Sequence, residues 1–186
     1  NFDNLKNIFA DLKGKKYSQN RHNAGYIVVD ELVSNIGSSS WKKKFKGSIS
    51  TGLINNKSVI FLKPSTFMNL SGESVLQIKN YLKIPTENII VIHDDLDLSI
   101  GKIKAKFSGG NAGHKGLNNI SKLIGNNYLR IRIGIGHPGK DYVSKYVLEN
   151  FKEDEFNLLE KNITYIRENI YFLMNNEINL FNEESK

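Results

Sequence analysis

Residues 87–95, ENIIVIHDD, contain an unbroken run of apolar, mostly β-branched residues that ends in carboxylates. This run predicts a strand covered on both faces, because a half-exposed strand would alternate apolar and polar residues. Covering both faces of a sheet takes helices, and helical patterns precede and follow this run. We therefore predict a three-layer α/β/α fold around one mixed, mostly parallel, twisted sheet.

Four helices are predicted where apolar residues recur every three or four positions. The first covers 27–36, and the second covers 72–83 with Ser71 as its N-cap. The third covers 116–125 and stops at Gly125. The clearest helix spans 156–173, and we expect the final residues, 180–186, to be a frayed tail.

The remaining strands are less uniform. Two β-rich runs, 48–54 and 58–64, flank an Asn-Asn turn and predict a hairpin. Residues 102–107 and 129–136 alternate, which predicts half-exposed strands and a less covered sheet edge. Residues 1–16 hold an atypical first strand, whose apolar spacing fits a helix equally well. No repeat or linker divides residues 1–186, so we expect a single domain.

Charge is the informative part of the composition. Lys+Arg is 26 and Asp+Glu is 19, a net charge of +7 that favours a polyanionic partner such as nucleic acid or anionic lipid. A solvated basic surface without a partner is the open alternative. Cysteine is absent, which favours a reducing compartment, and we expect a cytoplasmic protein with no membrane segment.

Three polar segments follow predicted strands, where open α/β sheets bind ligands. FMNLSG (67–72) offers the amide of Asn69, which could equally cap a turn. HDDLD (93–97) could hold a divalent cation or form a solvated turn. SGGNAGHKG (108–116) departs from a phosphate loop because Lys115 follows His114 instead of glycine, so we expect a flexible loop or lid.

The histidines leave alternatives of their own. His22, in the segment QNRHNAGY, lies just before the predicted apolar helix. This position fits either a surface residue or a catalytic base. For His114 and His137 no partner is visible in the sequence, and we expect structural roles.

Five segments, RHNAG, FMNLSG, HDDLD, GGNAGHKG and RIGIGHPG, occur in this order, and together they resemble the bacterial-type peptidyl-tRNA hydrolase family. The resemblance runs from about Tyr17 to the C-terminal helix. It implies a mixed sheet between helices and hydrolysis of the ester between peptide and tRNA, which recycles tRNA from aborted translation. We expect peptidyl-tRNA as the partner, with no cofactor, metal, membrane or protein partner, and a monomer.

The resemblance also implies roles for residues of this chain. His22 matches the catalytic histidine, Asp94 the carboxylate that supports it, and Asn69 an amide that contacts substrate. Tyr17 and Phe67 match residues placed against the tRNA end. The basic side chains expected at tRNA phosphates are Lys104, Lys106, Lys115 and Arg132. A neutral imidazole can activate water for ester hydrolysis, so neither a covalent nucleophile nor a metal is needed.

The chain departs from the family pattern in two segments. Leu12 and Lys13 stand where asparagine and proline are expected, and Lys115 stands where asparagine follows the histidine. These changes predict weaker discrimination between peptidyl-tRNA and aminoacyl-tRNA. The alternative function is a non-catalytic or weakly catalytic RNA-binding relative. A nucleotide-phosphate enzyme using the glycine-rich loop is a third interpretation, weakened by the incomplete motif.

Overall fold

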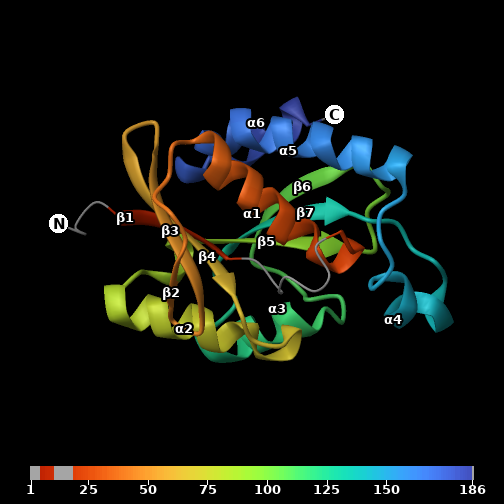
Figure 1. Ribbon diagram of the computed structural model, residues 1–186, viewed down its shortest axis with the longest axis horizontal. Helices are drawn as coiled ribbons and strands as arrows, with labels where there is room; N and C mark the ends of the chain where they lie inside the picture. Colours follow the sequence, from red (N-terminus) through yellow and green to blue (C-terminus); the bar gives the residue numbers. More distant parts are fainter. Residues whose placement is uncertain (1–4, 11–18, 186) are drawn as a thin grey trace.

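A seven-stranded sheet forms the middle layer of the protein in a computed structural model that describes residues 5–10 and 19–185 (Figure 1). The strand order is β2-β3-β4-β1-β5-β7-β6. The four central strands run parallel, and β3, β2 and β6 pair antiparallel at the edges. The mixed sheet of the prediction is confirmed. The strands are β1 (Leu5–Ala10), β2 (Lys42–Lys44), β3 (Gly47–Ile54), β4 (Lys57–Pro64), β5 (Ile89–Asp95), β6 (Ile103–Phe107) and β7 (Leu129–Gly134).

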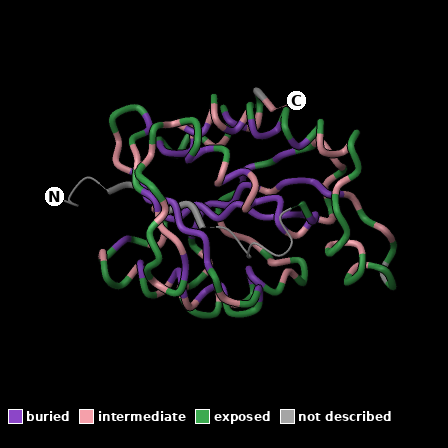
Figure 2. The backbone as a smooth tube through the Cα atoms, viewed as in Figure 1, coloured by how far each residue is buried: buried purple, intermediate pink, exposed green. Residues whose placement is uncertain are grey.

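Helices cover the two faces of this sheet and give two separate cores (Figures 1 and 2). On one face lie α1 (Ala24–Asn35), α5 (Glu153–Met174) and α6 (Ile178–Glu184). On the other lie α2 (Ser71–Leu82) and α3 (Lys115–Ile124). The short α4 (Val143–Tyr146) lies beyond the carboxyl end of β7. Within the described residues, no helix combines the length and the apolar character that a membrane crossing requires.

The strongest sequence patterns are confirmed. Every residue of β5 is buried, as its apolar run predicts. β3 and β4 form the predicted hairpin, and Asn55 and Asn56 adopt positive φ angles of 47° and 61° at its turn. Asparagine tolerates this left-handed conformation better than most residues, which explains why the chain reverses here.

Three expectations about individual elements are wrong. Ser71 is the first residue of α2 rather than its N-cap, and its hydroxyl donates to the Met68 carbonyl. β7 is covered on both faces despite its alternating sequence. Its Arg130 is buried instead of facing water, because its guanidinium donates hydrogen bonds to backbone carbonyls within the protein. The frayed tail expected at 180–186 is helical to Glu184, and Phe181 is fully buried against α5.

The sequence of the first segment fitted a helix and a strand equally well, and the structure decides between them for residues 5–10. Residues 5–10 form β1, which lies in parallel between β4 and β5, so strand rather than helix is correct for them. The pattern fitted both because a short apolar segment between two buried strands needs no alternation. Positions 11–16, including Leu12 and Lys13, lie outside the described residues.

Candidate active site

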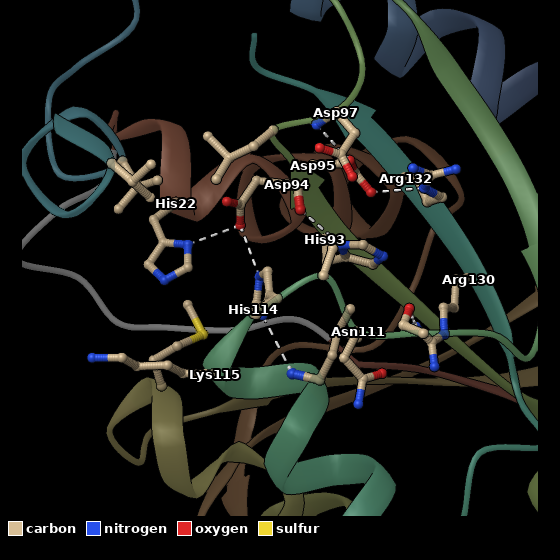
Figure 3. A pocket seen from close by; sticks show the side chains of 18 of the residues that line it. His22, His93, Asp94, Asp95, Asp97, Asn111, His114, Lys115, Arg130 and Arg132 are labelled. Atoms are coloured by element: carbon tan, nitrogen blue, oxygen red, sulfur yellow. Dashed lines mark hydrogen bonds and ion pairs between the residues drawn. The ribbon is translucent and has the colours of Figure 1, made fainter. Parts of the chain in front are cut away.

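A cavity of about 830 Å³ opens at the carboxyl ends of the parallel strands (Figure 3). Its walls come from segments far apart in the sequence: the start of α1, the end of β5, and the loops before α2 and α3. The segment around α4 closes another side. The predicted residues that line it are His22, Phe67, Asn69, Asp94, Lys106, Lys115 and Arg132. Tyr17 lies outside the described residues.

The backbone around His22 is held by the segment that follows α4. His22 lies in the short 3-10 helix η2 (Arg21–Asn23), which leads into α1. The His22 amide donates to the Val147 carbonyl at 2.8 Å. Next to it, buried Arg21 pairs with Glu155 at 2.7 Å. The imidazole of His22 is thus carried on a fixed backbone, with 18% of its side chain exposed to the cavity.

His22 and Asp94 are hydrogen-bonded, as the resemblance implies. His22 Nδ1 lies 2.9 Å from Asp94 Oδ1, and the other ring nitrogen points away from the carboxylate (Figure 3). Asp94 is the second-to-last residue of β5 and is buried. Burial by itself raises the pKa of Asp94. The charges and hydrogen bonds of His22 and His114 outweigh burial and lower this pKa below its ordinary value, so the carboxylate stays ionised.

His114 is a second partner of Asp94, and the structural role expected for it was incomplete. Its Nε2 lies 3.1 Å from Asp94 Oδ1, the same oxygen that His22 contacts. The Leu117 amide donates to His114 Nδ1 at 3.3 Å, because His114 is the N-cap of α3. The cap leaves the ring proton on Nε2, where it is donated to Asp94. The signal available in the sequence was a histidine directly before a helix.

His93 supports this group from behind. Its ring is buried, and its Nδ1 donates to the Asp94 carbonyl at 2.7 Å. Its ring centroid lies 5.3 Å from that of His114, edge to face. Burial, helped by the charge of His114, lowers the pKa of His93 to about 4. His93 is therefore neutral at neutral pH and adds no competing charge beside Asp94.

The carboxylates of HDDLD do not converge on a common cation. Asp95 pairs with Arg132 at 2.7 Å and accepts from the Asp97 amide, whereas Asp94 turns to the histidines (Figure 3). The group suited to a metal by residue type is instead His22, Asp94 and His114, whose ligand atoms lie within 4.8 Å of one another. Hydrogen bonds between the rings and Asp94 Oδ1 already account for the positions of these three side chains.

Arg130 holds the glycine-rich loop in place. Its guanidinium donates to the carbonyls of Gly110 at 2.8 Å and Gly109 at 3.0 Å, and it also contacts Asn126. The side chain is buried, and burial lowers the pKa of Arg130. The loop expected to be flexible is therefore tied to β7, and this fixes the approach to His114.

Like charges face one another across β6 and β7. Lys104 pairs with Arg132, and Lys106 pairs with Arg130, in antiparallel register. Opposed cations destabilise a sheet unless an anion or other acceptors compensate. Lys106 and Arg132 line the cavity, whereas Lys104 lines a smaller hollow beside α6. Asp95 already compensates Arg132, and loop carbonyls compensate Arg130, whereas Lys106 forms no ion pair among the described residues and suits an anion at this cavity edge. Lys104 is not among the residues that line the cavity.

Comparisons with known proteins agree with this geometry. The family model described as peptidyl-tRNA hydrolase matches residues 13–186. A peptidyl-tRNA hydrolase of Rickettsia bellii is 46% identical over 170 residues, which is 90% of this chain and 92% of that protein. One of Pelagibacter ubique is 47% identical over 163 residues, 87% of this chain and 88% of its own. The crystal structure of peptidyl-tRNA hydrolase from Acinetobacter baumannii superposes with a TM-score of 0.89 at 36% identity, over 96% of this chain and 95% of that one. This chain belongs to the peptidyl-tRNA hydrolase family.

Proposed function

We propose that the protein hydrolyses the ester between peptide and tRNA in peptidyl-tRNA, with His22 as general base and Asp94 as its support. The observation that carries this proposal is the 2.9 Å hydrogen bond between His22 Nδ1 and Asp94 Oδ1 at the wall of the cavity. Asp94 accepts a hydrogen bond from the Nδ1–H of His22, which leaves Nε2 unprotonated and free to accept a proton. Membership of the family supports the substrate assignment.

The reaction needs one water and no covalent intermediate with the enzyme. Nε2 of His22 removes a proton from water as its oxygen attacks the ester carbonyl carbon. The tetrahedral intermediate then collapses, the terminal ribose oxygen leaves, and the imidazolium returns the proton to it. Ionised Asp94 stabilises the imidazolium, as the acid of a catalytic triad does. General-base catalysis of this kind contributes about 10²–10⁴-fold.

Asp94 is well suited to this task because two hydrogen-bond donors hold it. His22 and His114 both contact the same oxygen, so the carboxylate keeps its orientation when His22 gains a proton. We assign His114 to positioning, since its second nitrogen is occupied by the α3 amide. Asn69, exposed on the cavity wall, is assigned to orienting the substrate, where its amide can donate and accept.

The tRNA part of the substrate is assigned to the basic wall. Lys106, Lys115 and Arg132 line the cavity, and their charges suit phosphates. Phosphate contacts give affinity without sequence choice, which fits an enzyme that accepts many tRNAs. Phe67, whose side chain is exposed, and Tyr17 are assigned to the tRNA end, as the resemblance implies.

The proposal also covers the cellular compartment and the oligomeric state of the protein. We assign the protein to the cytoplasm, because its substrate forms there and because the absence of cysteine fits a reducing compartment. A monomer suffices, because the described residues of one chain bring His22, Asp94 and Asn69 to one cavity. The non-catalytic RNA-binding alternative has no support among the relatives named above, which are hydrolases by name.

The test is turnover of an N-blocked aminoacyl-tRNA by wild type and by His22→Ala. Loss of the general base should lower kcat by at least about a hundredfold and leave the affinity for deacylated tRNA within a few-fold. His137→Ala is the matched control, because His137 lines the same cavity, but its Nδ1 accepts from the Gly139 amide and, among the described residues, its ring forms no hydrogen bond with Asp94. Near-normal turnover of His22→Ala would refute the mechanism.

A further inference from the structure

A group of lysine and aromatic side chains lies at the β2 edge of the sheet, opposite the edge formed by β6. We call it the basic strip and define it as Lys42, Lys44, Phe45, Lys46 and Tyr81. The three lysines are exposed, and Tyr81 is 64% exposed. Nothing in the proposed hydrolytic mechanism uses these side chains.

The members of the basic strip share the α2 side of the sheet. Lys42 pairs with Ile49 across the ladder, and Ile49 packs into the core beneath α2. Lys44 Nζ lies 4.3 Å from the Tyr81 ring centroid and 4.8 Å from that of Phe45. Because side chains alternate along a strand, Lys43 points to the other side. The lysines and aromatic rings thus lie on the α2 side of the sheet. Figure 1 shows β2 and α2 as neighbouring elements.

The turn that presents this surface is conformationally unfavourable. Phe45 and Lys46 form the two-residue turn between β2 and β3, with φ angles of 54° and 53°. Turns of this kind favour Asn-Gly, because larger side chains resist the left-handed region. The Ser74 hydroxyl donates to the Phe45 carbonyl, and Lys46 pairs with Glu73 at 2.6 Å. These contacts with α2 hold a turn that places Phe45 against Tyr81, with ring centroids 5.2 Å apart.

Charge on the basic strip is only partly neutralised. Among the described residues, Lys46 forms an ion pair with Glu73, and neither Lys42 nor Lys44 forms one. Lysines on an edge strand also prevent association with other strands. That role requires neither the strained turn nor the stacking of Lys44 on two rings. Exposed lysines interleaved with aromatic rings are the combination that binds nucleic-acid backbones and bases.

The basic strip continues into the rim of the cavity. The Ser65 amide donates to the Lys46 carbonyl at 2.9 Å, which ties the turn to the chain just before Phe67. Phe67 is 71% exposed and lines the cavity. Four strand spacings of about 4.8 Å separate β2 from β5, so the strip lies roughly 19 Å from Asp94. A tRNA is far larger than the cavity and can reach both.

We propose that the basic strip binds the phosphate backbone of the tRNA part of the substrate, outside the cavity; this inference rests on the proposed function. The occupant is RNA rather than the nascent peptide, because all substrates share tRNA whereas their peptides differ in charge. A fixed group of cations would hinder basic peptides and would give no general benefit to hydrolysis.

The experiment measures deacylated tRNA binding over a series of potassium concentrations. The test variant is Lys42→Ala with Lys44→Ala, and the control is Lys122→Ala with Lys161→Ala, two exposed lysines on α3 and α5 that remove the same charge. Each lost phosphate contact lowers the slope of log K against log salt by about 0.7–0.9. At about 0.1 M salt this corresponds to a roughly five- to eightfold weaker affinity per contact.

We expect the test variant to bind tRNA at least about tenfold more weakly, with a shallower salt slope, while the control matches wild type. Lys42→Arg with Lys44→Arg should restore binding, because charge and ring stacking remain. Hydrolysis of N-blocked aminoacyl-tRNA should show a raised KM with kcat unchanged. Equal tRNA binding by the test and control variants overturns the proposal. A result in which only substrates with acidic peptides respond to the change also overturns it. Failure of wild type to hydrolyse the substrate would refute the proposed function instead, and the binding result would still decide the role of the strip.

Discussion

Replacing His93 should make the protein less sensitive to acid. His93 is buried and its pKa is lowered to about 4, against about 6.5 for histidine in an unfolded chain. Between these two values the unfolded state binds a proton that the folded state does not. Stability therefore falls as the pH falls from about 6.5 towards 4, and this contribution is fully present only above that window.

The size of the effect follows from the two pKa values. The difference in bound protons between the unfolded and folded states, integrated over pH from 5 to 7, is about 1.35. This integral corresponds to about 2 kcal/mol of unfolding free energy. His93→Asn removes this titration and keeps an amide N–H that can donate to the Asp94 carbonyl. The variant loses packing and is less stable at pH 7, but it should lose about 2 kcal/mol less than wild type between pH 7 and pH 5.

Urea unfolding followed by circular dichroism at both pH values measures this difference. The comparison is between the pH dependences of the two proteins, so the packing loss cancels. His137→Asn serves as control, because it makes the same histidine-to-asparagine change at an exposed position. If wild type and His93→Asn lose the same free energy over this range, His93 titrates normally and the assigned cause, burial, is wrong.

Three other changes test separate parts of the structure. Arg130→Met removes the Arg130 donor from the buried Gly110 carbonyl, whereas the Gly109 carbonyl keeps Asn126 Nδ2 as a donor, so unfolding free energy should fall by about 1–3 kcal/mol in a denaturant titration, and an unchanged value would contradict the clamp. Phe181→Ala should cost about 3–5 kcal/mol, because Phe181 is fully buried and its ring packs edge to face on Tyr165; a thermal melt close to that of wild type would mean that α6 is dispensable. Leu12→Asn should sharpen discrimination between N-blocked and free aminoacyl-tRNA by roughly two- to tenfold, the value of one hydrogen bond, whereas Lys115→Asn should weaken tRNA binding more at low salt than at high salt. Hydrolysis of both substrates and binding at two salt concentrations measure these effects; if wild type already discriminates as strongly as Leu12→Asn, the family position is not Leu12.

The parts of this protein that follow from sequence alone are those governed by local pattern. The apolar run before HDDLD predicts a buried strand because covered strands need no polar face, and β5 is buried throughout. The hairpin follows from two asparagines that tolerate a left-handed turn. The pairing of His22 with Asp94 came from the order of five short segments, each of which is ambiguous when taken singly.

Other features depend on contacts between residues that are distant in sequence. His114 reaches Asp94 only because α3 begins beside the end of β5, and no spacing along the chain encodes that meeting. Arg130 breaks the alternation of β7 because the carbonyls of Gly109 and Gly110, about twenty residues away, accept hydrogen bonds from its two terminal nitrogens. Residues 180–185 look like a polar tail, yet Phe181 finds a place in the core and Asn182 exchanges two hydrogen bonds with Ala105. Local pattern determines which residues can be buried. Tertiary structure decides which polar groups can be buried with them, because a buried polar group needs a partner that only the folded chain supplies.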